Sequence, residues 1–401
     1  MAAGRLKASN DRNLGIDALR GAAALAVLVY HAREILWIGL TETLRRAGTP
    51  WDWDAWLGAA SLPFRWGHLG VPLFFVISGY CIHRPHVRRL ARDPSYRFPL
   101  GNYLARRVWR IYPVLMAALV LTAACDAVTR QLVPDDPILG DNSWYSAGIT
   151  LASLQNFVLP PYGSNGPLWT LSMELHFYLA YPLAFGGMRR LGAPATTAAT
   201  LLVSVACWAL GAAGYLPWAL FLPFWFSWMA GAYVAEAEAG RAAWPRLTML
   251  AAALPCLAVG MGAEYWARWV PLAAPLAYAV LAVPFSLVVW WAVTQTSWAL
   301  WSSNLSRWLA AVGVFSYSLY ATHKPLLVAY RAVVHDGEKS EYFLAIVPGM
   351  VLAVTVGWVT FMVVEKWSLA LPGSRSQRQK AQDAGAAPVG EVTPRSAEGS
   401  A

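Results

Sequence analysis

Apolar blocks of about 20 residues recur along most of this 401-residue chain, and they constrain its fold more than any other feature. Only 13% of the residues are charged, whereas a soluble domain carries about 25%. Inside a bilayer, a block of this length satisfies its own backbone hydrogen bonds only as a helix, because strands would need a closed barrel. The sequence therefore predicts an all-α, polytopic bundle of transmembrane helices.

The apolar blocks predict about ten spans. Their approximate bounds are 14–37, 66–83, 111–130, 168–188, 195–214, 218–235, 247–264, 271–293, 309–331 and 342–364. The apolar stretch 147–160 is too short to span, and we interpret it as a re-entrant or interfacial segment. With the N-terminus inside, the inner segments carry 21 Lys and Arg and the outer segments carry 7. This bias predicts cytoplasmic N- and C-termini.

The blocks also divide the chain into three parts. We expect a cytoplasmic segment at 1–13, a transmembrane domain at 14–371 and a disordered cytoplasmic tail at 372–401, where aromatic residues are absent. The net charge of +9 does not indicate a nucleic-acid partner, because the basic residues fall between the spans, where membrane topology explains them.

Two charged or titratable residues of the first span are candidates for function, because such residues are costly inside a bilayer. Arg20 and His31 lie eleven residues apart, which places them on one helical face and about 16 Å apart along the axis. This spacing suits a ligand lying along the helix, with an anion near Arg20 and a reactive end near His31. Alternatively, Arg20 pairs with Asp17 and a neighbouring helix satisfies His31.

Small and basic residues near the inner face form a second set of candidates. Ser78 supplies a hydroxyl and Gly79 allows close backbone approach, although small-residue helix packing explains them equally. Arg107 and Arg110 share one helical face and could bind phosphates, although membrane topology alone also predicts arginines here.

Later spans carry further polar residues. Glu174 stands near the start of the fourth span, where an acid can simply stabilise a helix N-terminus. Ser172 and Tyr178 nearby are more than such a cap needs. His323 falls in the middle of a span and is a candidate for the same reason as His31. His83 and His86 stand on either side of Pro85 in a basic loop, and we expect them to be solvated and not metal ligands.

Five motifs, in order along the chain, resemble those of membrane-bound acyltransferase family 3, whose members O-acylate surface glycans, Nod factors and some antibiotics. The motifs are Arg20 with His31, Phe74–Tyr80, Arg107–Pro113, Trp169–Tyr178 and Ser316–His323. Tyr80 and Thr170 replace the usual Phe and Ser, and Leu175 replaces a common second acid, so no role is assigned there. The resemblance covers roughly residues 14–364.

The resemblance implies an acyltransferase that uses acyl-CoA, in the first place acetyl-CoA, as donor and needs no metal. It implies His31 as the essential catalytic residue, acting as general base or transient acyl carrier, and we count Arg20 and Glu174 as further catalytic candidates. The implied donor-binding residues are Arg20, Ser78, Gly79, Arg107 and Arg110. Trp169, Ser172, Tyr178 and His323 are further candidates.

The predicted topology also assigns these residues to depths in the membrane. It places Arg20, Ser78, Arg107 and Arg110 at the inner leaflet, where cytosolic CoA arrives, and His31 and Glu174 toward the outer leaflet. We expect the CoA phosphates on the inner arginines and the thioester at His31. Glu174 would then orient or protonate a histidine, with His31 itself as one candidate.

The motifs do not identify the acceptor. The resemblance favours a glycan or lipid-linked glycan in the plasma (inner) membrane of a bacterium, with membrane lipid around the protein and no nucleic acid. Many relatives add an SGNH-type domain, and the tail does not resemble one, so we expect direct transfer or handover to a separate protein. The alternatives are a macrolide-like acceptor and, in a different class, a solute transporter without covalent chemistry, although no internal repeat supports a transporter.

Overall fold

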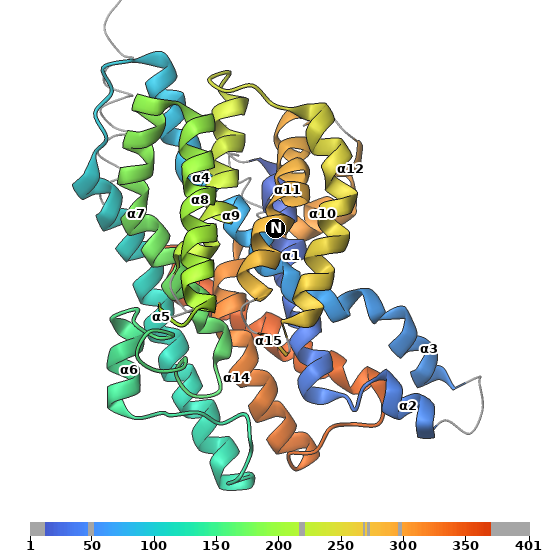
Figure 1. Cartoon of the computed structure of the whole chain (residues 1–401). Coiled ribbons are helices and arrows are strands. Elements are labelled where there is room, and N and C mark those ends of the chain that lie inside the picture. The colour runs from blue at the N-terminus through green and yellow to red at the C-terminus, as the bar shows by residue number, and fades with distance from the viewer. Residues whose placement is uncertain are drawn as a thin grey trace, which may run out of the picture.

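Helices make up the secondary structure that the described part of the chain contains (Figure 1). This computed structural model describes residues 13–46, 52–215, 221–267, 269–270, 273–295 and 299–369. Strand-like pairing in these ranges is limited to two isolated bridges, Trp37 with Ser340 and Gln155 with Leu159. The all-α prediction is therefore confirmed for these residues. The predicted cytoplasmic segment (apart from residue 13) and the predicted tail 372–401 lie outside them.

Long helices form the body of the bundle, and neighbours such as α4 and α9 or α10 and α11 pack along one another. The long helices are α1 (Leu14–Leu36), α4 (Gly70–Arg92), α5 (Leu100–Leu132), α7 (Trp169–Leu191), α8 (Ala193–Ala212), α9 (Leu222–Glu238), α10 (Arg246–Trp266), α11 (Ala273–Thr294), α14 (Ser316–His335), and a last run through α15 (Ile346–Thr360), η4 (Phe361–Glu365) and α16 (Lys366–Ser368). The shorter elements are α2 (Leu40–Arg46), α3 (Trp53–Ala60), η1 (Leu62–Leu69), α6 (Trp144–Leu151), η2 (Gly166–Leu168), α12 (Ala299–Ser302), α13 (Asn304–Val314) and η3 (Phe343–Ala345).

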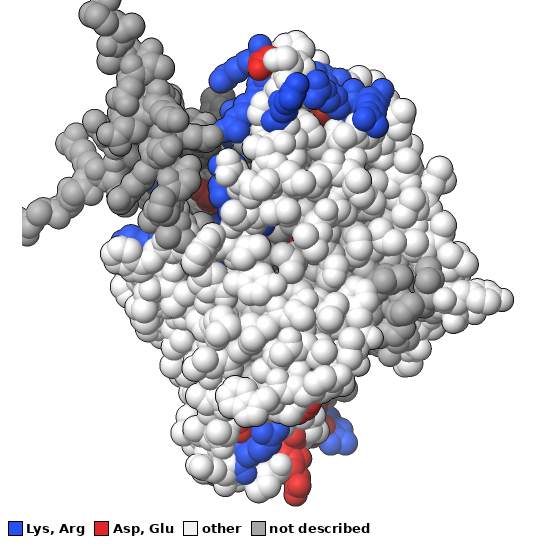
Figure 2. Space-filling model, turned by 90° about the vertical axis from the view of Figure 1, so that its left-hand side faces the viewer, with Lys and Arg blue, Asp and Glu red and all other residues white. Residues whose placement is uncertain are grey.

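The molecule has the charge distribution of a membrane protein. Among the described helices, six are long and apolar enough to cross a bilayer: α1, α5, α8, α10, α11 and the run Phe343–Ser368. On the face seen in Figure 2, charged side chains gather mostly at the two ends, with a broad uncharged belt between them. The chain is thus a multi-pass membrane protein, while the count of about ten crossings and the cytoplasmic termini stay predictions.

Several helix boundaries differ from those predicted. α4 continues as a helix to Arg92, and α5 already begins at Leu100, so most of the predicted basic loop is helical. The predicted span 309–331 is interrupted, because Phe315 ends α13 with non-helical backbone angles and α14 starts at Ser316. The stretch 147–160 contains only the end of the eight-residue α6, which is too short to span, as predicted.

Glycine pairs bring two pairs of helices into close backbone contact. A methyl group added to Gly21 on α1 or to Gly313 on α13 would overlap the backbone of the other helix. Gly79 on α4 and Gly231 on α9 form the same reciprocal arrangement. Small residues at such crossings are typical of helix packing in membranes, where close van der Waals contact replaces the hydrophobic effect as the driving force.

Replacing Gly231 by alanine is expected to destabilise the bundle by about 1–3 kcal/mol, because the new methyl group would overlap the carbonyl of Val76 on α4. The same change at Gly186 of α7 is the matched control, since no neighbouring atom lies within 4 Å of a methyl group placed there. Thermal unfolding in detergent measures both proteins. We expect a lower midpoint for Gly231→Ala and an unchanged or higher one for Gly186→Ala, and equal midpoints would contradict the close approach.

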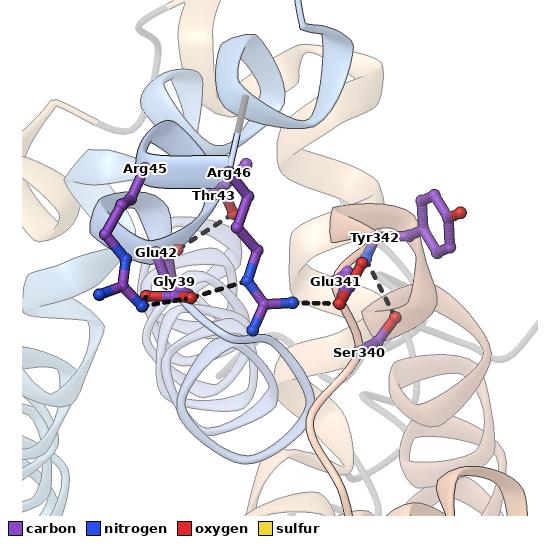
Figure 3. A network of polar contacts seen from close by, with 8 residues as sticks. All are labelled: Gly39, Glu42, Thr43, Arg45, Arg46, Ser340, Glu341 and Tyr342. Atoms are coloured by element: carbon purple, nitrogen blue, oxygen red, sulfur yellow. Dashed lines mark hydrogen bonds and ion pairs between the residues drawn. The ribbon is translucent and has the colours of Figure 1, made fainter. Parts of the chain in front are cut away.

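Polar contacts connect α2 to the segment before α15 at one end of the bundle (Figure 3). Arg46 of α2 pairs with Glu42 at 2.7 Å and also with Glu341. These ion pairs are exposed, and exposed pairs contribute little to stability. The backbone N–H of Ser340 donates to the carbonyl of Leu36 at 2.8 Å, which ties the end of α1 to this segment. The helix that carries His31 is therefore anchored near its C-terminus.

Candidate active site

A cavity of about 510 Å³ lies at the end of the bundle where α1 begins and α4 ends. Arginine is its dominant side chain, and the arginines that line it are Arg20, Arg84, Arg88, Arg89, Arg92 and Arg110. Glu238 pairs with Arg84 at 3.3 Å and with Arg88 at 2.7 Å, and Asp17 is the acid in the lining. Positive charge remains in excess, so the cavity suits a ligand with several anionic groups.

A second cavity, of about 90 Å³, lies deeper, between α1, α4, α5, α7 and α14. Arg20 and Arg110 line both cavities, so the two meet at these guanidinium groups. Arg110 is held by Glu365, with Nη2 and Oε1 3.8 Å apart, and its guanidinium lies 5.9 Å from the ring centre of Tyr317. The remaining lining is largely apolar and aromatic. A ligand that binds through anionic groups in the first cavity can therefore extend a short apolar part into the second.

Three polar side chains meet on one wall of the small cavity. Ser78 Oγ donates a hydrogen bond to Glu174 Oε2 at 2.8 Å and lies 3.4 Å from the hydroxyl of Tyr178. Trp228 Nε1 donates to Ser78 Oγ at 3.2 Å from the other side. Arg20, Arg110 and Glu174 line this same cavity. This wall thus offers a carboxylate and two hydroxyls beside the two arginines.

The predicted depths of Ser78 and Glu174 were wrong, since the sequence placed them in opposite leaflets and they are hydrogen-bonded. The reason lies in the segment before α7, which folds back into the bundle. Gln155 Nε2 donates to the carbonyl of Leu168 at 3.0 Å, and Asn165 Nδ2 donates to the carbonyl of Ala321 at 2.9 Å. α7 therefore starts inside the bundle, and Glu174 reaches Ser78, not His31.

His31 meets His323 where α1 packs on α14, with His31 Nδ1 and His323 Nε2 2.9 Å apart. The buried His323 also places its Nδ1 2.8 Å from the carbonyl oxygen of Tyr320. A carbonyl only accepts, so His323 carries a proton on Nδ1, and in its neutral form it accepts at Nε2. His31 then donates from Nδ1, which leaves the lone pair on its Nε2 free.

The small cavity approaches this histidine pair. Tyr320 lines the cavity, and its ring centre is 5.7 Å from that of His323. The ring centres of His323 and His31 are 5.0 Å apart. Arg20 lines both cavities near the start of α1, and His31 lies eleven residues further along the same helix, about 16 Å away by helix geometry.

Two of the predicted donor-binding residues have other surroundings. Gly79 does not form a turn, because it lies inside α4 at the crossing with α9, where it contacts the carbonyl of Trp228. Arg107 places its guanidinium 5.7 Å from the ring centres of both Tyr103 and Tyr178. Gly79 thus serves helix packing, and Arg107 supports the cavity wall from behind Tyr178.

Two further candidates support neighbouring segments. Trp169 packs among aromatic rings, with its ring centre 5.6 Å from that of Phe224. Ser172 Oγ donates to the carbonyl of Ser153 at 2.8 Å and so holds the chain that precedes α7. Both lie on α7, as Tyr178 does, but of these three only Tyr178 lines the small cavity.

The expectation that His83 and His86 are solvated was wrong, because α4 continues as a helix through Pro85 and buries both rings. His83 contacts Glu236 at 2.9 Å and the hydroxyl of Tyr181 at 3.0 Å. Within the described ranges, no group of three or more His, Cys, Asp or Glu side chains is placed to hold a metal ion.

Glu365 is the site residue that the sequence reasoning missed. Its side chain is 1% exposed, accepts a hydrogen bond from Ser318 Oγ at 2.7 Å and faces Arg110. It ends the π-helical turn Phe361–Glu365, a local widening that is frequent at functional sites. The only sign of it in the sequence is an acidic residue directly after an apolar stretch. Such a residue is also expected where any span ends, so it did not stand out.

The family model described as an acyltransferase domain, of acyltransferase family 3, matches residues 13–362. YrhL of Bacillus subtilis (strain 168), provisionally named a peptidoglycan O-acetyltransferase, is 26% identical over 204 residues, which are 48% of this chain and 27% of YrhL. The peptidoglycan O-acetyltransferase OatA of Listeria monocytogenes is 25% identical over 178 residues, which are 42% of this chain and 23% of OatA.

These matches span only about a quarter of each relative's own length. No solved structure matches the chain. The family match, in contrast, covers nearly the whole chain. The chain therefore belongs to the membrane-bound acyltransferase family 3.

Proposed function

We propose that this protein transfers an acyl group from acyl-CoA to a hydroxyl of a glycan, and that the acyl group is acetyl. The observation that carries the proposal is the order of the sites along α1. It leads from the arginine-lined cavity through Arg20 and Arg110 to the small cavity, and from there through Tyr320 to His323 and His31.

The large cavity is the proposed site for the nucleotide end of the donor. CoA carries several phosphates, and guanidinium groups bind phosphate through paired, charge-assisted hydrogen bonds. The pantetheine arm would pass Arg20 and Arg110 and lie against Ser78 and Tyr178, whose hydroxyls can bond its amides. The small cavity measures about 90 Å³. That is well below the range of drug-sized sites, which favours a short acyl group.

His31 is the proposed general base. Its Nε2 would take the proton of the acceptor hydroxyl while the hydroxyl oxygen attacks the thioester carbonyl carbon. The carbon–sulfur bond then breaks, and the CoA sulfur leaves as a thiolate that receives the proton from His31. The contact with His323 supports this role, because it holds the His31 ring with Nε2 unprotonated. The acyl-carrier role would need Nε2 as nucleophile and leaves a covalent acyl-histidine that trapping would detect.

A glycan is the proposed acceptor because the relatives YrhL and OatA carry names that state peptidoglycan O-acetylation. The arginine-rich end of the bundle would face the cytosol, as the positive-inside rule requires, in a bacterial plasma membrane. CoA would then enter from the cytosol, and the glycan hydroxyl would reach His31 from the opposite side. A macrolide-like acceptor is the alternative within the same chemistry.

The test follows thiol release from acetyl-CoA by the protein purified in detergent, with and without a peptidoglycan or surface-glycan fraction. We expect release that the glycan fraction stimulates, together with label from [14C]acetyl-CoA in the glycan. Stimulation by a macrolide alone would replace the acceptor. No release with any acyl-CoA, from protein that remains monodisperse, would contradict the proposal and favour a transporter, which a flux assay in proteoliposomes would then address.

A further inference from the structure

A third cavity, of about 290 Å³, lies between α8 and α10 and has α9 and α11 as its floor. It shares no lining residue with the two cavities on the donor path. Most of its lining is apolar, including Phe226 and Ala230 from α9 and Ala282 and Val283 from α11. The proposed transfer reaction does not use this groove, so a ligand bound here would be a different molecule from the acyl donor and the acceptor.

Three polar atoms in the lining stand without a hydrogen-bond partner among the described residues: Ser286 Oγ, Thr197 Oγ1 and Trp244 Nε1. Ser286 is the most buried of the three, with 3% of its surface exposed. A buried donor without a partner costs about 1–3 kcal/mol. Three such donors around one groove therefore point to a ligand with acceptor oxygens.

The groove opens toward the surrounding membrane. Its two side walls are the helices least covered by the rest of the protein, since only 17% of the span window of α8 and 6% of that of α10 is buried. Both helices are apolar enough to lie in a bilayer. A molecule that enters between them must come from the bilayer, and it must have a hydrocarbon part to match the floor.

The groove also lies at interfacial depth, at the arginine-rich end of the bundle. Trp244 and Pro245 line it just after α9, whose last residue Glu238 pairs with the arginines of α4. Trp244 stacks on Trp290 with ring centres 4.6 Å apart, and tryptophan favours the membrane–water boundary. The exposed Arg246, next to Pro245, adds a positive charge at the same rim. At this depth a membrane lipid carries its ester groups and, just outside them, its phosphate.

We propose that this groove binds one membrane phospholipid. The ester oxygens of the lipid accept hydrogen bonds from Ser286, Thr197 and Trp244, and the adjoining part of an acyl chain lies on the apolar floor of α9 and α11. The volume of the groove is close to the lower end of the range for small-molecule sites, which fits one ester group with part of one chain. This inference does not rest on the proposed acyl transfer.

The test removes the donors without changing the shape of the groove. Purified protein is stripped of lipid, titrated with dioleoyl phosphatidylglycerol in detergent and examined by native mass spectrometry, which counts bound lipids. We expect the double variant Thr197→Val/Ser286→Ala to bind the tightest lipid about tenfold more weakly, since two hydrogen bonds are lost. The matched control is Thr200→Val on the same helix, because the Thr200 hydroxyl already donates to the carbonyl of Thr197 at 2.7 Å.

A second readout uses Trp244. A brominated phospholipid quenches nearby tryptophans, so the wild type should lose more fluorescence than the Trp244→Phe variant, in which the quenched residue is missing. Equal lipid affinity in the wild type and the double variant would overturn the proposal. So would a loss of affinity of the same size in Thr200→Val, because the effect would then not depend on the groove.

Discussion

The His31→Ala protein is expected to lose acyl transfer by about 10²–10⁴-fold while it still binds acyl-CoA. The reason is that the proposed donor-binding residues and the proposed base lie at different positions along α1. The arginines that line the donor cavity are distant from His31, so their charge is unchanged when the imidazole is removed. Thiol release with the glycan fraction measures the rate, and isothermal titration with a non-hydrolysable acyl-CoA analogue measures donor binding.

Two further variants separate chemistry from packing. In His31→Asn the side-chain amide can still donate toward His323 Nε2 but offers no base, so we expect the same loss as in His31→Ala. His335→Ala is the control, since this histidine ends α14 and lies against Tyr330, outside both donor cavities. Near-normal transfer by His31→Asn would show that the residue serves only the helix contact.

Arg20→Ala is expected to raise the KM for acetyl-CoA by at least about 30-fold, with a smaller effect on kcat. Arg20 lines both cavities, so it lies between the proposed sites of the CoA phosphates and of the pantetheine arm. Removal of one partner from a desolvated, hydrogen-bonded charge pair costs about 2–5 kcal/mol, of which each 1.4 kcal/mol is a tenfold change. Initial rates over a range of acetyl-CoA concentrations measure both constants.

The control for Arg20 is on the same helix. Arg33 lies 5.6 Å from the ring centre of Trp37, at the opposite end of α1, and Arg33→Ala should leave the KM for acetyl-CoA unchanged. Arg20→Lys should fall between the wild type and Arg20→Ala, because an ammonium keeps the charge but cannot bind phosphate with two parallel bonds. Equal KM values for Arg20→Ala and Arg33→Ala would remove Arg20 from the donor site.

Features that depend on a single helix could be predicted from the sequence. The helix α1 begins at Leu14 because the side chain of Asn13 accepts a hydrogen bond from the N–H of Ile16 at 3.1 Å, a local contact that any such sequence can form. Helix periodicity likewise places Arg20 and His31 on one face, since it depends only on the number of residues between them. The apolar blocks predicted the all-α class for the same reason, because a bilayer permits few alternatives.

Contacts between helices could not be read in this way. Glu174 meets Ser78 only because the chain before α7 folds back into the bundle, and this depends on hydrogen bonds made by buried side chains of Gln155 and Asn165. The role of Gly79 depends on Gly231, which is 152 residues further along the chain and crosses it at van der Waals distance.

Sequence by itself determined that this protein is a helical membrane bundle and that Arg20 and His31 lie along one face of its first helix. Tertiary structure alone decided that Glu174 belongs with Ser78, that Glu365 holds Arg110, and that His323 sets the proton position on His31. The physical reason is the range of the forces. Apolar transfer and backbone hydrogen bonding act residue by residue, whereas side-chain hydrogen bonds require atoms within about 3 Å, and only the packed bundle brings distant residues that close.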